Sequence, residues 1–368
     1  MDVITFTREL IRVPSESSDP VSTDTQAPER GVVRLLQEVC DAYGVSWWTT
    51  EALPGRHNFM VRFPYPGTPR VLIIAHMDTV SSRGMTGPFA AEVRDGKIWG
   101  RGSCDDKGPL AAALITLLEL YRQNRELVYD VTFVATVDEE CTMSGAVKLA
   151  EDIDDWDLCI ALEPTTLKII RAHKGVYRFL LRTKGVAAHS SAPAKGENAV
   201  EAMLPILADI GKFGREISAR HNQDLGHASL AITKINGGSS LNTIPDRCEA
   251  AVDIRLLPEM TPDEMARQVR ACVAGRAEVV EVYRGNGIDT KVDHPLIRKL
   301  RHHINLAGGD PQPITAAFAT DCSKLAHKGP CIVWGPGDIR QAHQVDEHIE
   351  LSQLEAATHI LARFLTRG

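Results

Sequence analysis

The chain has 368 residues, with 43% hydrophobic and 24% charged residues, a composition typical of a soluble globular protein large enough for two domains. The formal net charge is −7, and no run of Lys and Arg forms the basic surface that nucleic-acid binding requires. We expect no membrane partner, because the apolar runs are too short to span a bilayer and the N-terminus lacks a signal-peptide core. The eight cysteines form no CxxC pair, so we predict reduced thiols in a cytoplasmic protein.

The first half of the chain predicts buried strands that alternate with helices. Residues 2–43 predict two helices around a Pro- and Ser-rich loop, and residues 109–124 predict an amphipathic helix that begins near Pro109. Three continuous apolar runs are typical of strands buried on both faces. These runs are 71–75, 130–137 and 158–164. The alternation indicates an α/β fold with a mainly parallel sheet.

Residues 175–287 predict a smaller domain inserted into the first one. Its predicted strands alternate apolar and polar residues, as expected of a sheet with one exposed face. Helices are predicted at 198–213 and 261–275, so the elements follow the β-α-β-β-α-β order of a ferredoxin-like fold. Helix–strand alternation then resumes. We therefore predict one domain formed by residues 1–174 and 288–368, interrupted by the insertion.

A histidine and an aspartate follow the first of the apolar runs. His76 and Asp78 are two residues apart, so they point to the same side of an extended backbone. A histidine can bind a metal ion while a nearby carboxylate orients its ring. A His–Asp hydrogen bond at the end of a strand explains this pair equally well.

Further carboxylates lie at comparable positions. Asp105 lies in the glycine-rich segment 100–108, before a predicted helix, where an aspartate is also a common N-cap. Asp138, Glu139 and Glu140 directly follow a predicted buried strand. Three adjacent carboxylates are costly there unless a cation neutralises them or the loop is solvated. The apolar run before them favours the cation.

Glu163 and His343 complete the candidate set. Glu163 ends the third apolar run and His343 follows a Gly-Pro-Gly turn, although each is also compatible with an ordinary turn or surface loop. Together, these histidines and carboxylates follow the carboxyl ends of predicted parallel strands, where open α/β sheets place their sites. Such ligands favour zinc, cobalt or manganese. The sequence therefore predicts a metal site.

Eight motifs, in order along nearly the whole chain, give a specific resemblance. The motifs are AHMDTV (75–80), GRGSCDDKG (100–108), ATVDEECTMSGA (135–146), LEPTTLKIIRAHKG (162–175), AHSSAPAKGENA (188–199), LNTIP (241–245), DIRLLPEMT (253–261) and GPGDIRQAHQVDE (335–347). The chain resembles the dinuclear-zinc amidohydrolases that include acetylornithine deacetylase, succinyl-diaminopimelate desuccinylase, aminoacylase and glutamate carboxypeptidase. The AHKG, HSS and QAHQVDE segments are most similar to the acetylornithine deacetylase branch.

The resemblance implies two divalent metal ions, Zn²⁺ in the first place and Co²⁺ or Mn²⁺ as alternatives, bridged by Asp105. The ligands would be His76, Asp105 and Glu163 for one ion, and Asp105, Glu140 and His343 for the other. Glu139 would be the general base, and Asp78 would hold the ring of the first histidine ligand. The peptide bond after the bridging aspartate would be cis.

The resemblance also assigns roles to the inserted domain, which would serve as the lid and dimerisation domain of a homodimer. His189 would reach the active site of the partner subunit and polarise the scissile carbonyl. Asn242 and Arg255 would bind the carboxylate end of the substrate, since a guanidinium pairs with a carboxylate through two hydrogen bonds.

The expected reaction is hydrolysis of the amide bond of an N-acyl amino acid, most closely the deacetylation of N-acetylornithine in arginine biosynthesis. A succinyl-diaminopimelate desuccinylase and a metallo-dipeptidase or carboxypeptidase are alternatives, because residues 320–322 depart from the deacetylase branch. A non-catalytic binding protein on the same scaffold is a third hypothesis, against which the retained ligands and Glu139 count. The segment 100–108 lacks the spacing of a nucleotide-binding loop.

Overall fold

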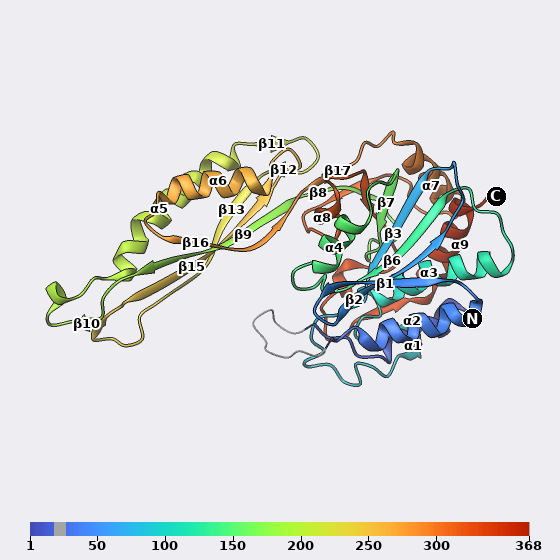
Figure 1. The fold of residues 1–368 in the computed structure, drawn as a ribbon, viewed down its shortest axis with the longest axis horizontal. Helices are drawn as coiled ribbons and strands as arrows, with labels where there is room; N and C mark the ends of the chain where they lie inside the picture. Colours follow the sequence, from blue (N-terminus) through green and yellow to red (C-terminus); the bar gives the residue numbers. More distant parts are fainter. Residues whose placement is uncertain (18–26, 368) are drawn as a thin grey trace. The chain divides into compact units, whose positions relative to one another are not determined.

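The computed structural model describes residues 1–17 and 27–367, which divide into two compact units (Figure 1). The second unit is formed by Ala172–Ile288 together with Thr315–Ala319, and the rest of the chain forms the first. The predicted insertion, 175–287, lies inside the second unit. Part of the loop expected between the two N-terminal helices lies outside the described residues. In the described part of the chain, no helix is long and apolar enough to cross a membrane.

The main sheet has nine strands among the described residues, in the order β1-β2-β6-β3-β7-β19-β8-β17, with β18 paired to β8. The strands are β1 (Trp47–Leu53), β2 (Arg56–Phe63), β3 (Arg70–His76), β6 (Asp130–Thr136), β7 (Leu158–Ala161), β8 (Ile170–His173), β17 (Ile288–Asp289), β18 (Ile314–Ala316) and β19 (Cys331–Val333). The four central strands, from β6 to β19, run parallel, and β1 and β2 are antiparallel. The predicted α/β class is therefore confirmed.

Helices cover this sheet. They are α1 (Val3–Ile11), α2 (Arg30–Tyr43), α3 (Lys107–Arg122), α4 (Ser144–Asp152), α7 (Pro295–Leu306), α8 (Cys322–Leu325) and α9 (Leu351–Leu365). The helix α3 contacts β3, α1 and α9, and it is buried on nearly every side. The prediction of an amphipathic helix was wrong for α3, because its leucines, alanines and isoleucine leave no polar stripe before Glu119.

The central parallel strands end at one edge of the sheet. His76, the last residue of β3, lies opposite Thr136, the last residue of β6. On the other side of β3, Ile74 lies opposite Ala161 at the end of β7. The loops that follow these strands therefore begin side by side, and this edge positions the candidate site.

The second unit contains a four-stranded antiparallel sheet in the order β13-β15-β9-β16. In chain order its main elements are β9 (Gly175–Lys184), α5 (Ala199–Ser218), β13 (Ser229–Gly237), β15 (Arg247–Leu256), α6 (Pro262–Val273) and β16 (Glu278–Gly285). Alternate residues of β9 are buried among residues of α5 and α6, which gives this unit its own hydrophobic core. A short ribbon of β10 (Ala188–His189) and β14 (Thr243–Ile244) extends from it.

Candidate metal site

Five of the predicted site residues lie together at the carboxyl edge of the main sheet. They form two overlapping groups, in each of which one possible ligand atom per residue lies within 4.8 Å of the others. The groups are His76, Asp105 and Glu163, and Asp105, Glu140 and His343. The residues come from the ends of β3, β6 and β7, from the loop before α3 and from the loop before β20 (His348–Glu350).

Asp105 is the residue shared by the two groups. Its Oδ1 lies 2.9 Å from Nε2 of His76, and its Oδ2 lies 3.4 Å from Nε2 of His343. The same nitrogen of His343 lies 3.1 Å from Oε2 of Glu140. The peptide bond between Asp105 and Asp106 is cis, as the family resemblance predicted. One carboxylate thus presents a separate oxygen to each histidine, an arrangement suited to bridging two ions.

The electrostatics of this cluster favour bound cations. Burial, and then the charge of Asp105, raise the pKa of Glu163 well above its ordinary value, and the same two causes raise the pKa of Glu140. Hydrogen bonds to Asp105 and Glu140 raise the pKa of His343 to about 10. Burial and mutual repulsion thus disfavour the charged forms of these carboxylates unless a cation lies beside them. Imidazole nitrogens and carboxylate oxygens are ligands that Zn²⁺, Co²⁺ and Mn²⁺ accept, so the residues fit two such ions.

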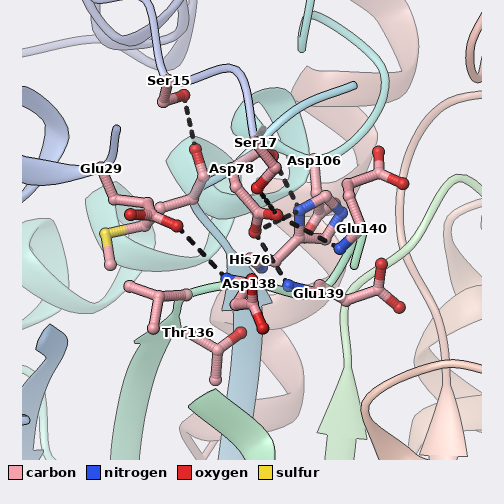
Figure 2. Close-up of polar contacts among 12 residues, drawn as sticks. Ser15, Ser17, Glu29, His76, Asp78, Asp106, Thr136, Asp138, Glu139 and Glu140 are labelled. Carbon is pink, nitrogen blue, oxygen red and sulfur yellow. Dashed lines mark hydrogen bonds and ion pairs between the residues drawn. The ribbon is translucent and has the colours of Figure 1, made fainter. Parts of the chain in front are cut away.

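The Asp78 side chain contacts His76 and has several further partners. Nδ1 of His76 lies 2.9 Å from the backbone carbonyl of Asp78, whereas the Asp78 carboxylate is 3.6 Å away. That carboxylate also accepts hydrogen bonds from the backbone N–H groups of Glu139 (3.0 Å) and Glu140 (3.2 Å) and from the Ser17 hydroxyl (2.6 Å), as Figure 2 shows. With its proton on Nδ1, His76 keeps Nε2 free for a metal ion.

The three adjacent carboxylates after β6 separate in the structure. Asp138 accepts a hydrogen bond of 2.8 Å from Nη1 of Arg56. Its own N–H lies 3.3 Å from Glu29 (Figure 2). Arg56 also forms an ion pair with Glu29, which is buried. No sequence pattern indicates this network, because its members lie far apart along the chain. Because Asp138 is paired with Arg56, the two other carboxylates, Glu139 and Glu140, are the ones available to the candidate metal site.

Glu139 belongs to neither group of candidate ligands among the described residues. Its carboxyl has a pKa well above the ordinary value, chiefly because of burial and then because of Glu163 and Asp321 nearby. Its backbone N–H is fixed by Asp78 at the end of β3. This arrangement leaves the carboxylate available to exchange a proton, as a general base requires.

The predicted residues of the inserted domain do not all lie together within one chain. His189 on β10 and Asn242, directly before β14, are neighbours, because these two strands pair. Arg255 lies near the end of β15 and forms an ion pair of 2.9 Å with Asp253. From Arg247, where β15 begins, to Arg255 the strand extends about 26 Å at ~3.3 Å per residue. Arg255 therefore lies at the other end of β15 from the segment that carries Asn242.

Three further carboxylates are buried near the candidate ligands. Asp106 accepts a hydrogen bond of 3.2 Å from the backbone N–H of His76, and Asp321 accepts one of 2.7 Å from the Thr136 hydroxyl. Burial raises the pKa of Asp321 to about 7. The third, Glu347, contacts the loop that carries the bridging aspartate. No sequence pattern predicted a role for Asp106 or Glu347, apart from the pair of adjacent aspartates, whereas Asp321 lies in the segment 320–322 that departs from the deacetylase branch.

Comparisons with known proteins find a matching family model and similar chains. Residues 72–367 match the model of peptidase family M20/M25/M40. The acetylornithine deacetylase of Proteus mirabilis (strain HI4320) is 30% identical over 376 residues, which cover 97% of this chain and 94% of that protein. A metallo-carboxypeptidase of the M20 family from Sulfolobus solfataricus has a TM-score of 0.81 at 18% identity, covering 99% of this chain and 98% of that one.

A second solved structure is similar over the whole chain. The YXEP protein of Bacillus subtilis, described as a dinuclear metal binding peptidase from the M20 family, has a TM-score of 0.68 at 17% identity. The match covers 98% of this chain and 96% of that one. At these identities the structural likeness establishes the fold.

Metal removal should lower the thermal stability of the protein, because the buried carboxylates then lack their cations. At a free ion concentration of ~100 times Kd, one site contributes about 2.7 kcal/mol, which corresponds to roughly 5 °C in Tm for a domain of this size. Calorimetry of chelator-treated protein titrated with Zn²⁺, Co²⁺ or Mn²⁺ measures this shift. The Glu163→Gln variant, which lacks one candidate ligand, should respond less. A Tm that none of the three ions changes would contradict the site.

Proposed function

Because this chain belongs to peptidase family M20/M25/M40 and is a metal-dependent amide hydrolase, we propose that it removes the acyl group of an N-acyl amino acid. Its substrate is N-acetylornithine or a related N-acetyl amino acid. The observation that carries the proposal is the Asp105 carboxylate, which directs one oxygen to each of two histidines in two overlapping ligand groups. The similarity to an acetylornithine deacetylase over 97% of the chain supports the choice of substrate.

The proposal includes two divalent ions, Zn²⁺ first and Co²⁺ or Mn²⁺ as alternatives. One ion would be held by His76, Asp105 and Glu163, and the other by Asp105, Glu140 and His343. When bound, the ions supply Lewis acidity and make a water molecule more acidic. The description of the Bacillus subtilis protein as dinuclear supports the number of ions.

The protein's own groups then move the proton. The Glu139 carboxylate takes a proton from the attacking water and later delivers it to the nitrogen of the departing amine. Asp78 holds the backbone N–H groups of Glu139 and Glu140, so the base and a metal ligand keep a fixed separation during both transfers. Holding reacting groups in place in this way contributes to catalysis without further cost at the moment of reaction.

We propose that residues 175–287 form a lid and dimerisation domain of a homodimer, as the family resemblance implies. β13 is an edge strand of its sheet, and Ile232 and Ile235 on it are 40% and 50% exposed. A second copy would cover this edge, which is otherwise open to unwanted pairing. In such a dimer, His189 of one chain would polarise the substrate carbonyl in the other. The separation of Asn242 from Arg255 along β15 supports contributions from two chains to each site.

A peptidase is the second candidate function. The likeness to the metallo-carboxypeptidase from Sulfolobus solfataricus, with a TM-score of 0.81, favours it. Succinyl-diaminopimelate desuccinylase remains a variant of the same chemistry, because Asp321 lies in a segment that departs from the deacetylase branch. The acyl group and side chain of the substrate therefore decide between these activities.

We also propose a cytoplasmic location. All eight cysteines lie in the described part of the chain and none forms a disulfide. Six of them are buried and two are half-buried, which is typical of thiols that pack as small apolar side chains. Free thiols of this kind are usual in a reducing compartment.

A panel of substrates tests the reaction. Protein loaded with Zn²⁺ or Co²⁺ should hydrolyse N-acetylornithine with a kcat/KM at least ~10-fold above that for N-succinyl amino acids and dipeptides, since a pocket that pairs with polar substrate groups discriminates strongly. The matched control is N-acetylornithine amide, which lacks the carboxylate. Preference for dipeptides would establish the second candidate, and no amide cleavage across the panel would refute the enzyme assignment.

Glu139→Gln should retain both metal ions and lose turnover by about 10²- to 10⁴-fold, because the amide cannot accept the proton. Metal analysis and steady-state kinetics of the purified variant measure the two effects. Asp130→Asn, a change at the opposite end of β6, serves as the control and should keep its activity. Near-normal kcat in Glu139→Gln would remove this residue from the role of base.

His189→Ala should lose turnover while its metal content stays unchanged. If His189 acts on the partner's site, an equal mixture of His189→Ala and Glu139→Gln chains, refolded together, should recover about a quarter of the wild-type activity. Half of random dimers are mixed, and each mixed dimer has one intact site. Recovery of no activity, measured against each variant refolded alone, would place His189 outside the partner's site.

A further inference from the structure

Glu347 lies four residues after His343 and directly before β20, and its carboxylate faces the loop that carries Asp105. We propose that Glu347 is the positioning residue that fixes Asp105 between the two ions. This inference rests on the proposed function, since it concerns the geometry of the same site. Neither the sequence analysis nor the family comparisons assign this role to Glu347.

Each of the two carboxylate oxygens of Glu347 accepts two hydrogen bonds from this loop. Oε1 accepts from the backbone N–H groups of Cys104 (2.9 Å) and Asp105 (3.1 Å). Oε2 accepts from the N–H of Gly102 (3.1 Å) and from Nη1 of Arg101 (2.6 Å). A carboxylate has about four acceptor positions, so Glu347 uses its full capacity on one short segment.

The Glu347 carboxylate is the acceptor for the N–H groups of Gly102, Cys104 and Asp105, whereas the N–H groups at 100, 101 and 103 have backbone acceptors. Between β5 (Lys97–Trp99) and α3, residues 100–106 belong to no helix or strand. Buried N–H groups without a partner are costly, and Glu347 supplies an acceptor for three of them. Gly102 has φ +82°, and a Cβ there would lie 2.8 Å from Thr79 Cγ2, so the chain is closely packed on its other side.

The guanidinium of Arg101 balances the negative charge of Glu347 within the same contact. Its exposed fraction is 1% and that of Arg101 is 2%, so both charges are removed from water. Arg101 also donates to the carbonyl of Ser81 at 3.0 Å. A buried ion pair is strongly destabilised when one partner is removed, whereas the complete set is tolerated.

Glu347 also connects the segments that hold the two ions. Its backbone carbonyl accepts from the N–H of Gly100 at 3.1 Å, and β20 pairs with β5 immediately afterwards. This hydrogen bond and this strand pairing hold the loop with Asp105 and the loop with His343 together where the two loops adjoin β5 and β20. Because Asp105 belongs to both ligand groups, a shift of this residue would disturb both ions at once.

The variant Glu347→Gln tests the inference through metal binding, without reliance on activity. The glutamine amide would direct its N–H₂ group at donors of Gly102 and Arg101, so the loop should move. We expect affinity for Zn²⁺, measured by competition with a chromogenic chelator on the apoprotein, to fall about 10- to 100-fold. The visible absorption of the Co²⁺ form should change as well, since it reports the ligand geometry around the ion.

Asp130→Asn is the matched control. Asp130 is a buried carboxylate that accepts two hydrogen bonds from Arg62, at 3.0 Å and 2.7 Å. It begins β6, about 20 Å along the strand from the site at ~3.3 Å per residue. This variant removes a bidentate carboxylate–arginine pair whose arginine is half-exposed, and it should lower Tm while Zn²⁺ affinity and the Co²⁺ spectrum stay at wild-type values.

The outcomes separate the inference from the proposed function. Wild-type affinity and spectrum in Glu347→Gln, or an equal loss in Asp130→Asn, would overturn the positioning role alone. Wild-type protein that binds no ion would overturn the proposed function together with the inference. If Glu347→Gln does not fold, Glu347→Asp decides, because it keeps the charge but withdraws the carboxylate by one methylene. We expect roughly tenfold weaker Zn²⁺ binding there, and unchanged binding would refute the role.

Discussion

Buried negative charge at one edge of the parallel sheet is the constraint on which the rest of the site depends. The buried carboxylates there are Asp78, Asp105, Asp106, Glu163, Asp321 and Glu347. Their mutual repulsion and the loss of hydration would oppose folding if each stood alone. The protein offsets this cost with histidines, with backbone N–H groups and, we propose, with two divalent ions. A metal site is therefore also part of what makes this edge of the fold stable.

Two carboxylates use backbone N–H groups in the same manner on opposite sides of the site. Asp78, after β3, holds the loop that carries Glu139 and Glu140, whereas Glu347, before β20, holds the loop that carries Asp105. Neither loop has a strand or helix of its own to satisfy these groups. Side chains thus replace regular secondary structure where the ligands must lie at fixed positions.

Local patterns predicted much of the fold and of the ligand set. Continuous apolar runs predicted the buried strands, and His76, Glu140 and Glu163 could be proposed because they lie at or just after the ends of such runs. The pattern failed for α3, because an apolar helix can be buried by the sheet on one side and by other helices on the other. The spacing of two residues placed Asp78 beside His76, but it did not indicate the hydrogen bonds of Asp78 with Glu139 and Glu140.

The sequence by itself determined which residue types could bind metal and near which strand ends they lie, because these properties depend on chemistry and on short-range periodicity. Tertiary structure decided how they meet. Contacts such as that of Glu347 with Asp105, or of Arg56 with Asp138, join segments more than 80 residues apart, and no local pattern encodes such a pairing. Packing of the loops at the sheet edge also decided that one oxygen of Asp105 faces each histidine, the feature from which the two-ion site follows.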